Sequence, residues 1–427
     1  MTGILKVLVD ILSVPAILVG LTAFAGYLAT KGKTFSDALA GGIKAAIGFF
    51  ILVAGAVTLI GSLDVLGPMI SEAFNVQGVV PNNEAIVAIA LGQLGQATAI
   101  IMVLGFVFNI LFARFTPFKY IWLTGHHSLY MASLLAATLS VLGLASWVLW
   151  LVGGLLLGFL QVLMPAWTQH LANKITGGEA DWTIGHFSSL SYVVSGWVAR
   201  IAGGDPAKTS AEDMEFPKGL GFLRESLVST GLIMLIIYLV PAIFLPSDSR
   251  NALGGDSTWW VYLFTQALTF SAGVAVVIYG VRVILGEIVP AFTGIAERLV
   301  PNAKPGLDIP VVFPFGANSV IIGFLSSFVA GIIMLLIMGP IGLAAIVPGL
   351  VPHFFVGGGA GVIGNAFGGR RGAVIGGFVN GIIISLGAAL LLPALGGLGF
   401  ENTTYGDADF QWVGSVIGLL GRLFGVQ

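Results

Sequence analysis

The chain has 427 residues, of which 57% are apolar and only 9% are charged. Ordinary soluble domains are roughly 25% charged, so this composition excludes an ordinary water-soluble protein. The net charge is −2 without a long basic run, which argues against nucleic acid as a partner. The absence of cysteine excludes disulfides, thiolate metal sites and a cysteine nucleophile. We interpret the chain as an all-α polytopic membrane protein.

Apolar runs that could cross a bilayer recur along the whole sequence. A spanning helix needs about 20 mostly apolar residues. The first run is too long for the apolar part of a secretory signal, so we expect a retained first helix. The last run is the weakest, because Arg422 interrupts it. About eleven transmembrane helices are predicted, at 11–29, 38–63, 94–113, 127–143, 146–166, 225–246, 258–284, 317–338, 341–357, 373–397 and 410–427.

Charged residues in the connections predict the sidedness of these helices. Lys31 and Lys33 follow the first run, and Arg114 follows the third, whereas the connections 64–84 and 398–409 are acidic. Basic connections stay on the cytoplasmic side of a membrane. We therefore expect a multi-pass protein with its N-terminus outside and its C-terminus in the cytoplasm.

A short internal sequence similarity predicts two inverted repeats. Val80-Pro81-Asn82 recurs as Val300-Pro301-Asn302, and matching features lie 220 to 222 residues apart, on opposite sides of the expected membrane. Inverted repeats usually carry the substrate site of a transporter at their interface. The proposed halves are 1–204 and 225–397, with a charged cytoplasmic connector at 205–224 and a C-terminal segment at 398–427. Chance recurrence in a low-complexity sequence is the alternative.

Four segments are too interrupted by proline, glycine and polar residues to be plain spans. They are 80–84, 183–189, 308–318 and 351–361. Non-helical backbone at membrane depth is tolerated only inside protein or beside a wet cavity. We therefore predict re-entrant hairpins around an aqueous site. Free N–H groups at the half-helix N-termini would suit an anionic ligand.

Polar side chains beside the breaks are the candidate functional residues. Burying an ionisable side chain inside a membrane costs free energy, so such residues usually have a functional role. The candidates are His126, His127, His186, Asp308 and Glu84. The alternatives are helix-bridging imidazoles and exposed loop carboxylates. Adjacent helical residues point about 100° apart, so His126 and His127 are not expected to face one small ligand. No metal-ligand or catalytic spacing is present, so neither a metal nor a cofactor is expected.

Several strings are similar to the ascorbate-specific IIC permeases of the bacterial phosphoenolpyruvate-dependent phosphotransferase system. The resemblance covers nearly the whole chain, in order. The strings are Val80-Pro81-Asn82-Asn83-Glu84, Leu123-Thr124-Gly125-His126-His127-Ser128, Thr183-Ile184-Gly185-His186-Phe187, Phe313-Pro314-Phe315-Gly316-Ala317-Asn318-Ser319-Val320-Ile321-Ile322-Gly323-Phe324 and Gly368-Gly369-Arg370-Arg371-Gly372-Ala373.

The resemblance implies an elevator-type homodimer in the bacterial cell membrane, with a dimerising scaffold domain and a core domain that holds L-ascorbate. The chain differs from the better-known relatives of this family at Asn83, Glu84 and Phe187. The implied substrate-binding residues are Asn83, Glu84, His126, His127, Ser128, Leu129, Tyr130, His186, Phe187 and Asp308.

The resemblance also implies that the sugar is phosphorylated on delivery by a phosphocysteine of a separate IIB protein, with a IIA protein upstream. This chain has no cysteine, so it takes part in group translocation without supplying the phosphoryl donor. The loop 205–225 is either a docking surface for IIB or a solvated connector. Two rival functions remain: a permease for another sugar acid or polyol of the same superfamily, and an uncoupled secondary transporter.

Overall fold

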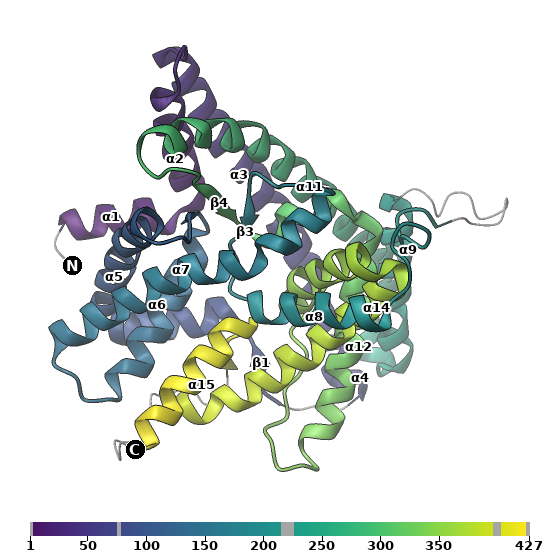
Figure 1. Cartoon of the computed structure of the whole chain (residues 1–427). Helices are drawn as coiled ribbons and strands as arrows, with labels where there is room; N and C mark the ends of the chain where they lie inside the picture. The colour runs from purple at the N-terminus through teal and green to yellow at the C-terminus, as the bar shows by residue number, and fades with distance from the viewer. Residues whose placement is uncertain (1–2, 75–77, 215–225, 396–402, 424–427) are drawn as a thin grey trace.

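The computed structural model describes residues 3–74, 78–214, 226–395 and 403–423 (Figure 1). Within these residues, 6 helices are long and apolar enough to cross a membrane, and two shorter apolar helices accompany them. The predicted spans fall mostly on helices, but residues 341–349 are not helical. The expected number of eleven spans stays a prediction.

One group of helices, which we call the first bundle, packs around the long helix α11. Its members are α2 (Pro15–Ala29), α3 (Phe35–Leu63), α4 (Leu66–Phe74), α9 (Ser226–Phe244), α10 (Ser247–Ala252) and α11 (Trp259–Arg298). Helix α1 (Gly3–Ser13) precedes them and ends where Pro15 starts α2. The apolar run 11–29, predicted as one helix, is therefore divided, because proline favours the first turn of a new helix.

The other helices form a second bundle, which carries the interrupted segments. They are α5 (Asn83–Phe115), α6 (Gly125–Ser140), α7 (Ser146–Thr176), α8 (Ser189–Ala202), the 3-10 helix η2 (Ile309–Phe315), α12 (Ala317–Met338), α13 (Leu350–Pro352), the π-helical turn η3 (His353–Gly357), α14 (Gly358–Leu395) and α15 (Ala408–Leu423). Figure 1 shows α15 in yellow, beside α6 and α14.

Glycines allow the long helices to approach within backbone contact. A Cβ atom on Gly280 of α11 would meet the main chain of Leu52 on α3, and one on Gly323 of α12 would meet the main chain of Gly357 and Gly361. Helices in lipid associate largely through such close packing, because lipid offers no hydrophobic driving force between them. The high glycine content of the sequence is explained by these crossings.

The mostly helical structure is consistent with the all-α prediction, and five short strands accompany the helices in the described residues. The strands are β1 (Val80–Pro81), β2 (Tyr120–Trp122), β3 (Thr183–Ile184), β4 (Lys304–Leu307) and β5 (Thr403–Thr404). All pairings are parallel: β1 pairs with β5, and β4 lies between β2 and β3. Extended backbone inside the protein needs hydrogen-bond partners, and these pairings supply them where the helices are interrupted.

Three of the four predicted interruptions are confirmed, and the fourth is wrong. Residues 80–84, 183–189 and 308–318 each combine a short strand or 3-10 turn with the start of a helix. The segment 351–361 is instead continuous helix with a π-helical turn, and the break lies further on, at Gly368 and Gly369. Gly369 has φ 61°, a left-handed conformation that glycine adopts without a Cβ penalty. The predicted span 341–357 therefore begins only at Leu350.

Candidate functional site

The predicted site residues gather at the carboxyl ends of the three-stranded sheet. Trp122 of β2 and Thr183 of β3 both lie beside Gly306 of β4. Parallel strands present their carboxyl ends at one edge. The next residues along each chain segment therefore meet there: His126 after β2, His186 after β3 and Asp308 after β4.

Asp308 is the centre of this group. Its Oδ1 atom lies 2.7 Å from Nδ1 of His186, and its Oδ2 atom lies 3.3 Å from Nε2 of His126. The main-chain N–H of Ile309 also donates to Asp308, 2.7 Å away, and this bond caps η2. Three predicted residues from separate parts of the chain are thus brought into one hydrogen-bonded cluster.

The β1–β5 pair adds a second carboxylate on the other side of His186. Asp407 follows β5, and its Oδ1 atom lies 3.1 Å from Nε2 of His186. Asn83 follows β1; its amide donates to Asp407, and its carbonyl oxygen accepts the N–H of Gly406 at 2.8 Å. The two sheets therefore meet through the ring of His186.

The partners of His186 define its charge. A neutral imidazole carries one N–H donor, whereas both ring nitrogens of His186 face carboxylate oxygens. His186 lies in the loop between α7 and α8. Burial alone disfavours its charged ring, but the hydrogen bonds to Asp308 and Asp407 outweigh burial and raise the pKa of His186. The geometry is that of an imidazolium held between two carboxylates.

His127, another predicted binding residue, belongs to the same cluster. It is 3% exposed, its ring centroid lies 4.0 Å from that of His186, and it stacks on Phe410 at 15° between ring planes. Its Nδ1 atom is buried without a hydrogen-bond partner among the described residues. Both neighbouring imidazoles contribute because the cluster surrounds the start of α6 rather than facing one side of it.

Two sets of side chains have the spacing of metal ligands, which the order of residues along the chain did not reveal. In His126, His127 and Asp308, and again in His127, His186 and Asp407, the ligand atoms lie within 4.8 Å of one another. Both nitrogens of His186 already bond to carboxylates. The absence of a metal therefore stays a prediction.

The other predicted residues of the run from Ser128 to Tyr130 line or support the cluster. Ser128 is buried, accepts a hydrogen bond from Gln161 at 2.8 Å and donates to the main chain of Thr124 at 3.3 Å. The half-buried ring of Tyr130 lies 5.7 Å from that of His126, between centroids. Leu129 packs against the apolar core.

Phe187 lies at the edge of the cluster, with its ring centroid 6.1 Å from that of His127. The ring of Phe187 is fully buried and stacks on Trp122, with 4.4 Å between centroids. This contact makes it a wall of the site in this conformation. Glu84 lies in the first turn of α5, but its side chain falls outside the described part of the structure.

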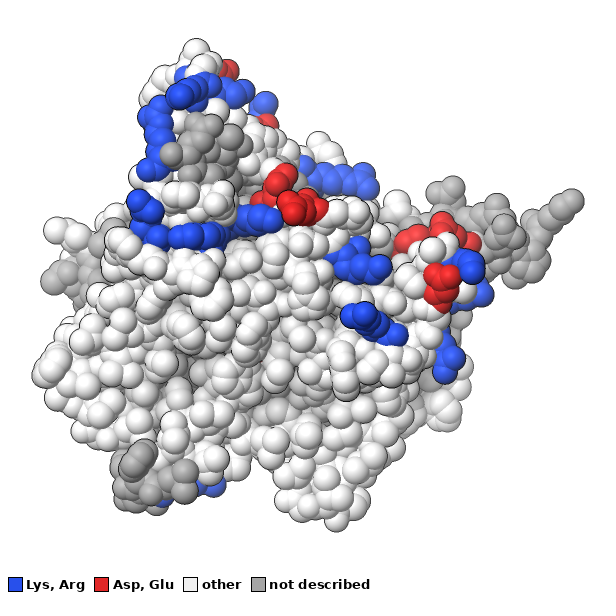
Figure 2. Space-filling model, viewed as in Figure 1, with Lys and Arg blue, Asp and Glu red and all other residues white. Residues whose placement is uncertain are grey.

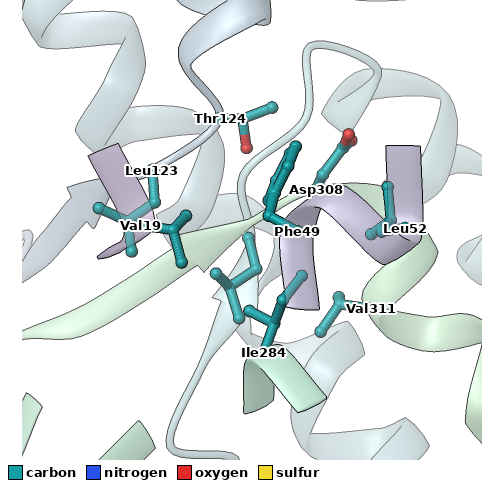
Figure 3. A pocket seen from close by; sticks show the side chains of 9 residues that line it. Val19, Phe49, Leu52, Leu123, Thr124, Ile284, Asp308 and Val311 are labelled. Atoms are coloured by element: carbon teal, nitrogen blue, oxygen red, sulfur yellow. The ribbon is translucent and has the colours of Figure 1, made fainter. Parts of the chain in front are cut away.

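A cavity opens beside Asp308, between the two bundles (Figure 3). Its empty volume is about 360 Å³, open solvent included. Asp308 and Thr124 provide its oxygen atoms, and the other walls are apolar. These walls are Val19, Phe49, Leu52 and Ile284 of the first bundle, with Leu123, Leu307 and Val311. An apolar pocket with a few converging polar groups is the usual form of a small-molecule site.

Asp407 and Asp409 are the residues that the sequence reasoning missed. The carboxylate of Asp409 accepts hydrogen bonds from the main-chain N–H groups of Ser189 and Leu190, at 2.7 and 3.1 Å. It therefore caps α8, whose N-terminus is not free for a ligand as we had expected. No local signal indicates this pair, since His186 and Asp407 lie 221 residues apart.

The apolar helices and the polar cluster buried among them define a multi-pass membrane protein with an internal polar site. Residues 10–409 match the family described as "PTS system sugar-specific permease component". The chain belongs to this family of phosphotransferase-system (PTS) permeases. It is similar to the "Ascorbate-specific PTS system EIIC component" of Mycoplasma pneumoniae, with 26% identity over 438 residues. That alignment covers 87% of this chain, which spans 64% of the relative's length.

The positions of Phe187 and His126 predict different consequences of substitution. Phe187→Leu should lower the free energy of unfolding by about 1–3 kcal/mol, because it shrinks a fully buried ring, and should leave ligand preference unchanged. His126→Ala should leave thermal stability nearly unchanged, since the side chain is 31% exposed, and weaken ligand binding. Melting curves in detergent and ligand titrations measure both. A stable Phe187→Leu protein with altered ligand preference would place that ring in the site.

Proposed function

We propose that this chain is the IIC permease of a phosphotransferase system that binds and translocates L-ascorbate. The observation that carries the proposal is the cluster of Asp308, His126 and His186 at the wall of the cavity between the bundles. The printed name of the Mycoplasma relative supports the choice of ascorbate.

The charges of the cluster suit an anionic, hydroxylated ligand. Ascorbate carries a delocalised negative charge and a neutral hydroxylated tail. An isolated carboxylate would repel the anion, but Asp308 is paired with His186 and lies beside His126. In the proposed complex the imidazole of His126 donates to the ring oxygens of the ligand, and carboxylate oxygens accept its hydroxyl protons.

We include the inverted repeats in the proposal, since the strand pairing supports them. Three helices, a strand, further helices, a strand and a short helix follow one another in α2 to α8, where β2 is an additional strand, and again in α9 to α15, which extends the second half beyond residue 397. The leading strand β1 of the first half pairs with the closing strand β5 of the second. The leading strand β4 of the second half pairs with the closing strand β3 of the first. A two-fold relation between the halves would produce this exchange.

In the proposed mechanism the second bundle is the core domain that carries the ligand, and the first bundle is the scaffold domain. The cavity lies between them, so a displacement of one bundle against the other would open the site to either side. Exposed apolar side chains follow one face of α3 at Ile43, Ile47, Phe50 and Val57. Lipid and the scaffold of a second copy in a homodimer both fit such a face.

We propose that the basic end of the molecule is cytoplasmic. Figure 2 shows that Lys and Arg gather over the upper part of the molecule, around the purple α2–α3 hairpin of Figure 1. Lys304 pairs through its main chain with Lys119, which places two of the basic connections together. The end of α15 lies at the opposite end of the molecule in Figure 1. The proposal therefore places α15 with its end outside, and does not retain the cytoplasmic C-terminus expected from the sequence.

The chain has no cysteine, so phosphorylation of the sugar would require a separate IIB protein at the basic end. The described part of the connector, up to residue 214, is tied to the second bundle. Glu212 accepts the N–H groups of Asn318 and Ser319 at the start of α12, at 3.0 and 2.9 Å. This anchoring lets a partner that docks on the connector influence η2 and Asp308. The rest of the loop, 215–225, lies outside the described residues.

Purified protein should bind L-ascorbate. Asp308→Asn removes the carboxylate that pairs with His186 and lies beside His126, so it should weaken binding at least about tenfold, the factor that corresponds to one pKa unit. His170→Ala is the matched control, since this imidazole is exposed and its ring packs on Phe367 away from the cluster. Titration calorimetry measures the affinity. Competition by other sugar acids and polyols tests the first rival: tighter binding of one of them would replace ascorbate as the substrate.

Uptake should depend on the soluble phosphotransferase proteins. Cells that express this chain but lack the partner IIA and IIB proteins should not accumulate labelled ascorbate. Restored IIB should rescue uptake and yield a phosphorylated product, whereas IIB without its phosphocysteine should not. Accumulation of unmodified ascorbate without IIA and IIB would support the uncoupled secondary transporter.

Single cysteines in this naturally cysteine-free chain should report its orientation. Lys33→Cys lies at an exposed position between α2 and α3, and Arg422→Cys lies at the end of α15. An impermeant thiol reagent applied to intact cells should label the second and not the first. The reverse pattern would invert the proposed orientation.

A further inference from the structure

Asp407 is positioned to organise the ligand site rather than to fill it. It is 3% exposed, and it accepts hydrogen bonds from three side chains: the imidazole of His186, the amide of Asn83 and, at 3.3 Å, the hydroxyl of Ser188. These donors precede or begin helices that are far apart in the sequence. One carboxylate thus fixes two of the predicted binding residues.

We propose that Asp407 is a positioning residue of the ligand site, which holds His186 as an imidazolium and fixes Asn83 at the start of α5. This inference rests on the proposed binding of an anionic sugar in the cavity beside Asp308. It assigns a part of the site to the C-terminal segment, to which neither the family match nor the resemblance gave a role.

The surroundings of Asp407 give it little freedom to move. The preceding strand β5 pairs with β1, and the N–H of Gly406 donates to Asn83. The following helix α15 is joined to α8 by reciprocal caps: Asp409 caps the N-terminus of α8, and the hydroxyl of Ser188 accepts the N–H of Ala408 at 3.2 Å. The carboxylate is therefore preorganised, as a residue that positions another must be.

The charge of His186 depends on all the titratable groups around it. Asp308 and Asp407 face its two nitrogens, His127 packs against its ring, and Tyr192 of α8 lies 5.8 Å away between ring centroids. His126 shares Asp308, and Asp409 caps the adjacent helix. Of these groups, the carboxylates favour the imidazolium and the neighbouring imidazoles disfavour it. Removing Asp407 takes away one of the two carboxylates in direct contact.

The imidazolium matters for the ligand because it neutralises Asp308. If His186 loses its proton, its neutral ring no longer offsets the carboxylate that lines the cavity, and an anion meets an uncompensated negative charge. Asp407→Asn should therefore have little effect on ascorbate binding in acid, where His186 remains protonated. As the pH rises, affinity should be lost at lower pH than in the wild type.

The experiment compares Asp407→Asn with wild type and with Ser415→Ala, which alters a hydroxyl of α15 that bonds only to the main chain of Gln411. Ascorbate affinity is measured from pH 5.5 to 8.5. At the alkaline end Asp407→Asn should bind about tenfold more weakly than wild type, and at the acid end within about threefold, since one pKa unit is a factor of ten. Loss by one constant factor at every pH would overturn the proposal.

A second measurement does not depend on the ligand. The chain has only five histidines, so ¹⁵N spectra of the ring nitrogens can follow His186, identified by its absence in His186→Gln. In ligand-free protein at pH 7.5, wild type and Ser415→Ala should show His186 with both nitrogens protonated, and Asp407→Asn should show a neutral ring. An unchanged His186 in Asp407→Asn would overturn the positioning role.

The two measurements separate failure of this inference from failure of the proposed function. If wild type does not bind ascorbate while the spectra change as expected, the substrate is wrong and the role of Asp407 stands. If Asp407→Asn does not fold, His186→Gln is used instead, because it removes the imidazolium charge directly. It should then reproduce the loss of ascorbate affinity at alkaline pH, and full retention of affinity would overturn the inference.

Discussion

The site depends on one physical constraint, the burial of charge. Asp308, Asp407 and His186 lie inside an apolar molecule, and a buried charge is stable only when it is paired and hydrogen-bonded. The imidazole ring lies between the carboxylates at 2.7 and 3.1 Å. Each carboxylate takes a further hydrogen bond, from Ile309 or from Asn83. Because no member can be removed without leaving another uncompensated, this network fixes the relative positions of the two small sheets.

The sequence predicted the membrane class, the places of three interruptions and most members of the cluster. Composition was sufficient for the first, and proline and glycine beside polar residues were sufficient for the second. Histidines 126, 127 and 186 with Asp308 were identified because ionisable groups are expensive at depth. These arguments depend on local sequence, where the chemistry of a residue and its neighbours decides the outcome.

The sequence was a poor guide wherever tertiary contact decided the structure. Strands of two to four residues carry no periodic signal, so the sheets were missed. Asp407 was read as part of an acidic connection, because its partners His186 and Asn83 lie 221 and 324 residues away. The glycine-rich run 357–361 was interpreted as a break, although Gly357, Gly358 and Gly361 pack closely against α12. The stacking of Phe187 on Trp122 also depends on tertiary contact and was not predicted.

The pairing of β1 with β5 joins residues 80–81 to 403–404, so the first interruption is closed by a strand far along the chain. During synthesis the start of α5 must wait for residues that are made after the helices from α5 to α14. Until then the backbone of β1 has no strand to bond to, and Asp308 holds His186 from one side only. A nascent protein stalled before residue 403 would contain the helices of the first bundle and the residues that line the cavity, but its His186 would lack the second carboxylate.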